Sequence, residues 1–394
     1  MSTIFTPAHI LLPDGGSDAY ARFAVIACDQ FTSEPDYWRA AEAAVGGAFS
    51  ALDLILPEVY LGTPEEARRS VAIREAMLSA AERLQSHPDS LVYLERTLPD
   101  GSVRRGLVGK IDLAAYDYSP DSASPIRPTE ATVTSRIPPR VAIRREATVE
   151  LPHVMLLMDD PTDAVLAAAA KSASEPIYDF SLMLGGGHAR GYLLTGQALE
   201  TTLAAIAAYE ASREGVVYAV GDGNHSLASA AAYYREQGDL DSPARYALVE
   251  LVNLHDPALE FEPIYRLLKN CDPDDVLAAL SAAGTSEITV PAVTTAGERQ
   301  IPLPRTHALT VGSLQEWIDA YIAAHPGTEC DYIHGEDALR TLAREDGCVG
   351  FLCNGIEKAE LFPYVTAHGP LPRKTFSMGE AKSKRYYIEA RKIR

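Results

Sequence analysis

Cysteine is scarce and scattered in this chain of 394 residues. The five thiols are Cys28, Cys271, Cys330, Cys348 and Cys353. They form no CxxC pair, and no histidine follows them at zinc-finger spacing. Cys348 and Cys353 bound the apparent strand CVGFLC, where their odd spacing places them on opposite faces of the strand. We therefore expect reduced thiols rather than a disulfide framework or a shared metal ion.

Long apolar runs and excess positive charge are also lacking. No stretch approaches the roughly 18 apolar residues that span a bilayer, and the first residues have no basic region ahead of an apolar run. The 54 acidic against 35 basic residues give a formal net charge of −19, which repels a phosphate backbone. The composition therefore predicts a cytoplasmic protein with no membrane or nucleic-acid partner.

Several catalytic motifs are missing as well. The chain has no GxxxxGK[ST] loop and no GxGxxG opening a helix after a strand, which argues against Walker-type ATPases and Rossmann dehydrogenases. It also has no GxSxG elbow, so acyl-transfer chemistry has no positive signal. Any nucleotide chemistry must use a different site.

Helical and strand patterns alternate along the chain and predict an α+β protein with mixed sheets and flanking helices. Helical spacing is expected over residues 37–48, 64–85, 197–211 and 273–283, and a hairpin around Pro99-Asp100-Gly101-Ser102. The length favours two or more domains. We expect an N-terminal α+β domain over residues 1–211 and a second α+β domain over residues 212–394.

The strongest candidate site is GDGNHS, Gly221 to Ser226, between the strand VVYAV and a helix that ends at Gly238. Glycines let the backbone approach a ligand, and a helix start offers free N–H groups to an anion. The candidate ligand-binding residues are Gly221, Gly223, Asn224 and Ser226. Asp222 is a candidate for catalysis and for binding Mg²⁺, and His225 for acid–base work. The alternative is a plain glycine turn with Ser226 as a helix cap.

Three further segments carry charge that suits an anionic ligand. IRPTEAT offers the catalytic candidate Glu130 and the ligand-binding candidates Arg127 and Thr132, unless these form a solvated loop pair. GGGHARG offers Arg190, either as part of a phosphate lid or in a mobile hairpin. The C-terminal region is basic within an acidic protein and includes the ligand-binding candidates Arg373 and Lys374.

Other chemistry-bearing residues have weaker signals. Cys28 and Asp29 follow the apolar run FAVIA, but the sequence places no base beside the Cys28 thiol to make it a nucleophile. His153 and His255 are typical of core or turn histidines.

GDGNHSLASA, IRPTEAT, VELVNLHDPALEFEPIYRLL and the tail LPRKTFSMGEAKSKRYYIEARKI together resemble domain-of-unknown-function family 1015. The family's glycine motif, DGHHR, is similar to that of ParB-type and sulfiredoxin-like proteins and of free-serine kinases, and the resemblance implies a strand–glycine loop–helix core with phosphate at the helix start. Asp222, Gly223 and His225 match this motif. Asn224 replaces a histidine and Ser226 the arginine, so Arg127, Arg190 or a basic C-terminal residue must supply that cation.

The resulting hypothesis is a nucleotide-dependent phosphotransferase, a small-molecule kinase, that acts on a hydroxyl compound such as free serine. It predicts ATP or ADP and Mg²⁺ as cofactors. The same residues also suit a phosphate-ester or nucleotide hydrolase, or a non-catalytic nucleotide or metabolite sensor. The sequence leaves open the substrate and whether the chain forms homo-oligomers.

Overall fold

The computed structural model describes residues 3–239 and 241–394 and divides into two compact units. The first unit comprises Met1–Leu259 and Glu380–Arg394, and the second comprises Glu260–Gly379. The predicted boundary near Ala211 thus falls inside the first unit. The reason is that the strand and helix that follow Ala211 pack against elements from the first half of the chain, which pattern alone does not reveal.

The first unit is built on a mixed sheet with the order β6-β11-β8-β12-β5-β4-β10-β9. β1 pairs with β5 and β2 with β4 at its side. These strands are β1 (Phe5–Thr6), β2 (Ala8–Pro13), β4 (Leu84–Thr97), β5 (Val103–Asp112), β6 (Ile126–Pro128), β8 (Met155–Met158), β9 (Tyr178–Ser181), β10 (His188–Leu194), β11 (Tyr218–Asp222) and β12 (Tyr246–Asn253). β6 runs parallel to β11 and β8 parallel to β12, whereas β11 is antiparallel to β8. The predicted α+β class is confirmed.

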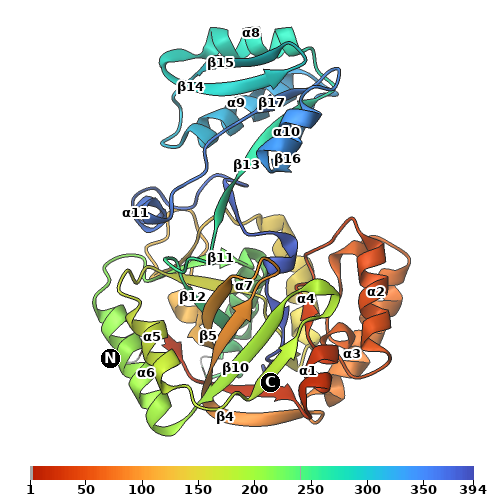
Figure 1. Ribbon diagram of the computed structural model, residues 1–394, viewed down its shortest axis with the longest axis vertical. Helices are drawn as coiled ribbons and strands as arrows, with labels where there is room; N and C mark the ends of the chain where they lie inside the picture. The colour runs from red at the N-terminus through yellow and green to blue at the C-terminus, as the bar shows by residue number, and fades with distance from the viewer. Residues whose placement is uncertain (1–2, 240) are drawn as a thin grey trace. The chain divides into compact units, whose positions relative to one another are not determined.

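Helices cover both faces of this sheet. They are α1 (Ser17–Phe23), α2 (Pro35–Val45), α3 (Glu65–Ala80), α4 (Ile137–Glu146), α5 (Ala164–Ser172), α6 (Gly196–Ala211) and α7 (Asn224–Gln237). Neighbouring residues on one strand enter different cores: Tyr93 packs with residues of α4 to α7, and Val92 with residues of α1 to α3. The reason is that successive side chains of a β-strand point to opposite faces of the sheet. Figure 1 shows α5 and α6 side by side on one flank and α1 to α3 together on another.

The predicted hairpin around residues 99–102 joins β4 to β5. The Asp100 carboxylate accepts hydrogen bonds from the backbone N–H and the hydroxyl of Ser102, and Gly101 adopts a φ of 89°. A side-chain-to-backbone hydrogen bond from an aspartate and a glycine with a positive φ are both typical of such a turn. The predicted hairpin between β9 and β10 is also formed.

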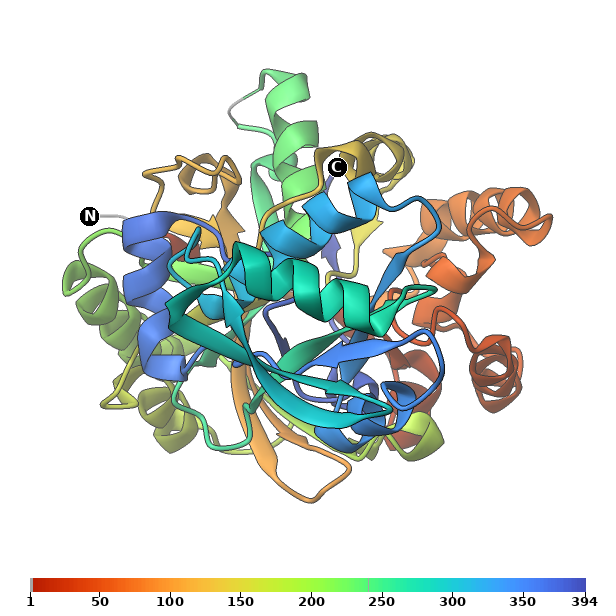
Figure 2. The same ribbon diagram turned by 90° about the horizontal axis from the view of Figure 1, so that it is seen from above.

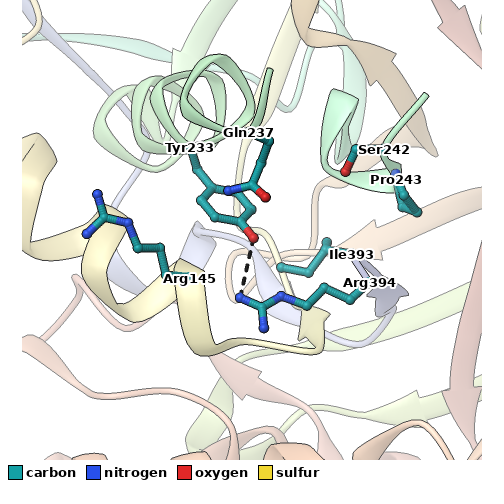
Figure 3. A pocket seen from close by; sticks show the side chains of 7 residues that line it. All are labelled: Arg145, Tyr233, Gln237, Ser242, Pro243, Ile393 and Arg394. Atoms are coloured by element: carbon teal, nitrogen blue, oxygen red, sulfur yellow. Dashed lines mark hydrogen bonds between the residues drawn. The ribbon is translucent and has the colours of Figure 1, made fainter. Parts of the chain in front are cut away.

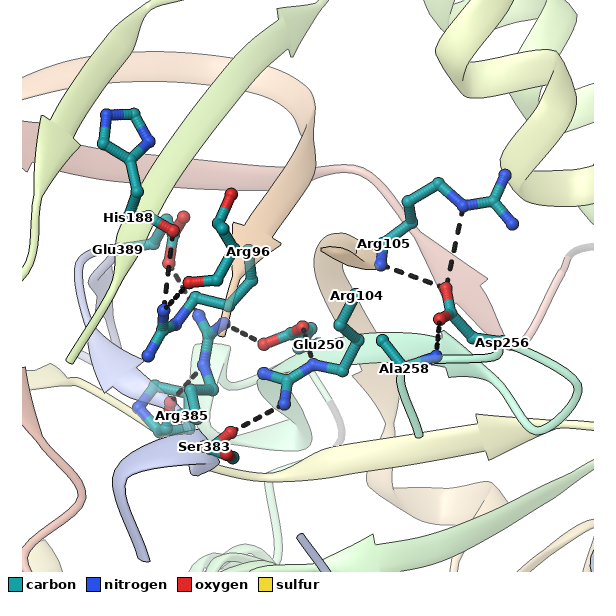
Figure 4. A network of polar contacts seen from close by, with 12 residues as sticks. Arg96, Arg104, Arg105, His188, Glu250, Asp256, Ala258, Ser383, Arg385 and Glu389 are labelled. Atoms are coloured by element: carbon teal, nitrogen blue, oxygen red, sulfur yellow. Dashed lines mark hydrogen bonds and ion pairs between the residues drawn. The ribbon is translucent and has the colours of Figure 1, made fainter. Parts of the chain in front are cut away.

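The C-terminal residues of the chain return to the first unit. β19 (Tyr386–Tyr387) pairs with β3 (Val25–Ile26), and β20 (Arg391–Lys392) pairs with β7 (Val149–Glu150). Just before β19, the Arg385 guanidinium is buried and binds the buried carboxylates of Glu250 and Glu389, at 2.5 and 2.6 Å. Figure 4 shows this network. Of the basic C-terminal residues, Arg385 and Arg391 are therefore buried in the first unit.

The second unit has its own sheet, with the order β15-β14-β17-β13-β16 and β18 beside β13. Its elements are β13 (Phe261–Lys269), α8 (Pro273–Ala283), β14 (Thr285–Thr294), β15 (Gly297–Leu303), α9 (Thr310–Ala324), β16 (Glu329–His334), α10 (Glu336–Leu342), β17 (Val349–Phe351), α11 (Lys358–His368) and β18 (Phe376–Met378). Leu268 faces a core with α8 and α9, and Leu267 packs with Leu339 of α10. Figure 2 shows α8 lying along the twisted β14–β15 hairpin.

The two strands predicted on either side of His255-Asp256-Pro257 both form, but they do not share a sheet. β12 pairs with β5 and β8 in the first unit, whereas β13 pairs with β16, β17 and β18 in the second. The turn between them is the point at which the chain leaves the first unit. Over the described residues, no helix has the length and apolar character needed to cross a membrane.

Candidate functional site

The predicted glycine loop is a tight connection between β11 and α7. Gly223 precedes the helix with a φ of 80°, in the left-handed region. A Cβ atom built on Gly223 comes within 3.0 Å of the Cα atom of Val154. Both the backbone angle and the close approach therefore require glycine here. Gly221 lies where the register between β11 and β8 shifts, and α7 begins at Asn224, so that Asn224, His225 and Ser226 form its first turn.

Asp222 is held from two sides at the end of β11. Its Oδ1 atom accepts a hydrogen bond from the Gly223 N–H at 2.9 Å, and its Oδ2 atom lies 3.3 Å from the Nζ atom of Lys384. The Lys384 side chain is only 14% exposed. Sequence reasoning did not select Lys384 as a site residue. The signal that could have found it was the basic C-terminal segment.

His225 is uncharged at neutral pH. Burial lowers the pKa of its imidazole, and the positive charges of Arg136 and Arg140 lower it further, to about 4. Its Nε2 atom accepts a hydrogen bond from the Val133 N–H at 3.2 Å. Since Nε2 is the acceptor, Nδ1 carries the proton and is the atom that can donate to a ligand.

The segment IRPTEAT lies beside the glycine loop because β6 pairs with β11. Asn224 donates from Nδ2 to the Glu130 carbonyl oxygen at 3.3 Å, while its own Oδ1 atom is buried and accepts no hydrogen bond among the described residues. Arg127 is buried and its Nε atom donates to the Ser124 carbonyl at 2.8 Å. The Thr132 hydroxyl faces the buried phenol of Tyr116. Arg127 thus braces its own loop, which argues against its role as a ligand-binding cation.

A second group of polar side chains comes from segments that lie far apart in the sequence. The sequence analysis did not predict that these segments come together. The Tyr387 Oη atom accepts a hydrogen bond from the Cys28 N–H at 3.2 Å and lies 2.8 Å from the Nδ1 atom of His153. The Nε2 atom of His153 is 3.6 Å from the Oδ2 atom of Asp29. Pairing of β19 with β3 brings Tyr387 to this place. His153 is thus a mostly buried histidine with a hydrogen-bond partner, as its pattern indicates, and it lies close to Asp29.

Electrostatics link the two groups. Burial raises the pKa of Asp29, but the charge of His153, a hydrogen bond from Gln30 and the charge of Lys384 together lower it below its ordinary value. The charge of Asp29 in turn acts on His225. Lys384 thus interacts with both Asp222 and Asp29, and all of these residues belong to the first unit.

Cys28 is a poor nucleophile at this position. Burial of its thiol and the negative charge of Asp29 raise the pKa of Cys28 to about 12, so little thiolate is present at neutral pH.

The structure does not bring all predicted residues to the glycine loop. Arg190 lies on β10, which four strands separate from β11, and its Nε atom pairs with Asp179 at 2.7 Å. Arg373 and Lys374 belong to the second unit, where Arg373 pairs with Asp319 at 2.7 Å. Their role at the glycine loop stays a prediction.

No group of three or more His, Cys, Asp or Glu side chains within residues 3–239 and 241–394 could hold a metal ion. A pocket of about 450 Å³ lies away from the glycine loop, near the end of α7. Figure 3 shows that its lining includes Arg145, Tyr233 and Arg394, with Arg394 donating to the Tyr233 hydroxyl at 3.3 Å. None of the predicted site residues lines it.

Comparison with known proteins gives a family and remote structural relatives. No curated protein matches the chain. A free serine kinase mutant in complex with ADP has 12% identity and a TM-score of 0.41, over 73% of this chain and 92% of that one. A conserved hypothetical protein from Pyrococcus furiosus has 13% identity and a TM-score of 0.36, over 71% and 90%. C-terminally truncated SbnI from Staphylococcus aureus has 10% identity and a TM-score of 0.35, over 72% and 81%.

The family assignment covers nearly the whole chain. The family model described as "Protein of unknown function (DUF1015)" matches residues 13–392, which include both units, the glycine loop and the C-terminal segment. The chain therefore belongs to the DUF1015 family.

Proposed function

We propose that the first unit carries a phosphoryl-transfer site, and that the protein is a nucleotide-dependent phosphotransferase for a small hydroxyl compound. The observation that carries this proposal is the Lys384–Asp222 pair at the start of α7. A helix start attracts phosphate through its unpaired N–H groups and its dipole. A mostly buried lysine at the same place adds the charge that phosphoryl transfer needs.

Lys384 fills the role of the arginine that Ser226 replaces in the family motif. The other two candidates for that cation are less suitable, because Arg127 is buried against its own loop and Arg190 is paired with Asp179 on β10. When a phosphate binds, the Lys384 ammonium can exchange part of its interaction with Asp222 for one with a phosphate oxygen. The neutral His225 can donate from Nδ1 without adding charge.

Mg²⁺ fits this site only together with the nucleotide. Mg²⁺ is commonly held by one or two carboxylates plus substrate phosphates and water. Asp222 is the carboxylate that would hold it here, and Asp29 lies within electrostatic reach of the same lysine, Lys384. The ion would neutralise charge on the phosphates.

The first experiment is a thermal-shift series with ATP, ADP, pyrophosphate and serine, each with and without Mg²⁺. Free serine is the first acceptor to test because of the resemblance of the glycine motif to that of free-serine kinases. A nucleotide at about 100 times its Kd stabilises the native state by about 2.7 kcal/mol. We expect this stabilisation in the wild type and its loss in Lys384→Met and Asp222→Ala. Arg190→Ala is the control that keeps it.

Product analysis then separates the related functions. Formation of ADP together with a phosphorylated acceptor supports the phosphotransferase. ADP and free phosphate without a phosphorylated acceptor indicate a hydrolase, and nucleotide binding without turnover indicates a sensor. The absence of any shift with phosphate-bearing ligands contradicts the proposal.

A further inference from the structure

We propose that Asp29 is the proton acceptor for the substrate hydroxyl, and that His153 and Tyr387 are positioning residues that fix its carboxylate. This inference rests on the proposed phosphotransferase function and assigns a residue that the glycine motif does not contain. It differs from the expectation from the sequence, which names Asp222 and Glu130 as the carboxylates for catalysis.

The hydrogen-bond chain orients His153 toward Asp29. The Cys28 N–H donates to the Tyr387 Oη atom at 3.2 Å. The Nδ1 atom of His153 lies 2.8 Å from the same oxygen. In its protonated form, whose charge lowers the pKa of Asp29, the imidazole carries a proton on each ring nitrogen. Its Nε2–H lies on the side of His153 that faces Asp29 Oδ2.

The Asp29 carboxylate keeps an oxygen available to a ligand. Its Oδ1 atom accepts a hydrogen bond from Gln30 Nε2 at 3.0 Å. Its Oδ2 atom is 3.6 Å from His153 Nε2, which is longer than a hydrogen bond, so its lone pairs can still accept a hydroxyl. In Asp222, by contrast, one oxygen accepts the Gly223 N–H and the other faces Lys384. Asp222 is thus better placed to organise the phosphate side of the site.

The position of Asp29 relative to the phosphate site follows from the pairing of β3 with β19. The Ala27 N–H donates to the Arg385 carbonyl at 3.0 Å, which brings the chain at Cys28 and Asp29 beside Lys384. Lys384 pairs with Asp222 at 3.3 Å, and its charge also stabilises ionised Asp29. A phosphoryl group bound near Lys384 therefore has Asp222 and the start of α7 close by and Asp29 within electrostatic reach. The carboxylate is ionised and 30% exposed, so it can accept a proton from a molecule that enters the site.

The step balances as follows. The acceptor O–H bond breaks, and its proton goes to Asp29 Oδ2. The hydroxyl oxygen forms a new bond to the γ-phosphorus of ATP. The bond between that phosphorus and the bridging oxygen breaks, and its electron pair leaves with ADP. Asp29 later returns the proton to water.

The test compares kcat with nucleotide binding in three variants. Asp29→Asn keeps the shape but cannot accept the proton, so kcat should fall by about 100-fold or more while the thermal shift with ATP stays. Asp29→Glu should recover part of the lost kcat. Asp179→Asn, which changes a carboxylate on β9 outside the site, should keep wild-type kcat.

His153→Gln tests the positioning role through the pH profile of kcat. The groups that face Asp29 are His153, Lys384, His225 and the uncharged Cys28 thiol. Removing the imidazole removes a contribution that lowers the pKa of Asp29, so the acidic limb of the profile should move to higher pH. A residue that only supports the fold would lower the amount of active protein without moving this limb. The pH profile of His153→Gln therefore tests the inference even if Asp29→Asn folds poorly.

Three results would each overturn the inference or part of it, in distinguishable ways. If the wild type phosphorylates an acceptor and Asp29→Asn does so at an unchanged kcat, Asp29 is not the proton acceptor and the proposed function stands. If the wild type transfers phosphate to no hydroxyl compound, the proposed function fails and the role of Asp29 fails with it. An acidic limb that stays in place in His153→Gln removes the positioning role of His153.

Discussion

At the scale of single residues, the site depends on a few positions. At one of them glycine is required, and at the others a particular charged or neutral side chain is. Gly223 combines a left-handed backbone with a close approach to Val154. His225 is neutral because of the burial and the two arginines around it. Lys384 of the C-terminal segment supplies a positive charge beside the glycine loop, which contains no lysine or arginine. Each of these features suggests a measurement.

Alanine at Gly223 should destabilise the protein more than alanine at Gly238. Both glycines have positive φ values, 80° and 64°, which cost an alanine about 1 kcal/mol. A Cβ atom at Gly238 meets no atom within 4 Å, whereas one at Gly223 meets the Val154 backbone at 3.0 Å. Urea unfolding of the two variants measures the difference. Equal losses would mean that the loop relaxes away from Val154 at no cost.

The protonation of His225 should make stability depend on pH. The pKa of His225 is about 4 in the folded protein and 6.5 in its ordinary state, so the unfolded chain binds the extra proton between these values. The stabilising effect of a neutral His225 is therefore fully present above pH 6.5 and is lost as the pH falls toward 4. Urea unfolding at pH 7.5, 6 and 5 should show a steeper fall for the wild type than for His225→Gln. Parallel curves would contradict the assignment.

At the scale of elements, the C-terminal segment fixes the site from inside the first unit. The Arg104 Nη1 atom donates to the Ser383 carbonyl at 2.7 Å, and the Arg96 Nη2 atom donates to the Lys382 carbonyl at 3.2 Å. Arg385 binds Glu250 and Glu389 from the other side of Lys384. The backbone around Lys384 is thus held on both sides; Figure 4 shows the contacts of the neighbouring residues Ser383 and Arg385.

Loss of the Arg385 guanidinium should be strongly destabilising. Arg385→Met would leave the buried carboxylates of Glu250 and Glu389 without this partner, and breaking a buried pair in this way costs about 3–5 kcal/mol. Arg190→Met, which removes an exposed ion pair on β10, is the matched control and should change stability little. Denaturant unfolding compares the two. Similar losses in both variants would show that the buried network adds no stability of its own.

Elements were easier to predict from the sequence than the contacts between them. The turn at residues 99–102, the strand before Gly221 and the helix ending at Gly238 follow local rules of spacing and turn chemistry, and all three form. Within the predicted site, Asn224 and Glu130 are brought together by the parallel pairing of β6 with β11. Tyr387, His153 and Asp29 meet only because distant strands pair. Local pattern carries no information about such pairing, so this part of the site was missed.

At the scale of the whole molecule, the second unit is an insertion in the sequence of the first. The chain leaves the first unit after Leu259 and returns at Glu380. The predicted boundary near Ala211 assumed that domains follow one another along the chain. An inserted unit with its own core breaks this assumption, and composition gives no sign of it.

The separate cores predict local effects of core mutations. Leu280 of α8 and Leu166 of α5 are both fully buried, in different units. Leu→Ala at either position should cost about 2–5 kcal/mol. Hydrogen exchange should then quicken in β14 and β15 for Leu280→Ala, and in the sheet of the first unit for Leu166→Ala. Faster exchange in both units from either variant would mean that the units unfold as one.

The insertion also sets an order of events during synthesis. Glu250 emerges from the ribosome before the whole second unit, but Arg385, its buried partner, emerges after it. Until then Glu250 can pair with Arg104 but not with Arg385, and the first unit also lacks Lys384 and Tyr387. The site proposed around Lys384 therefore cannot form until the whole second unit has been synthesised.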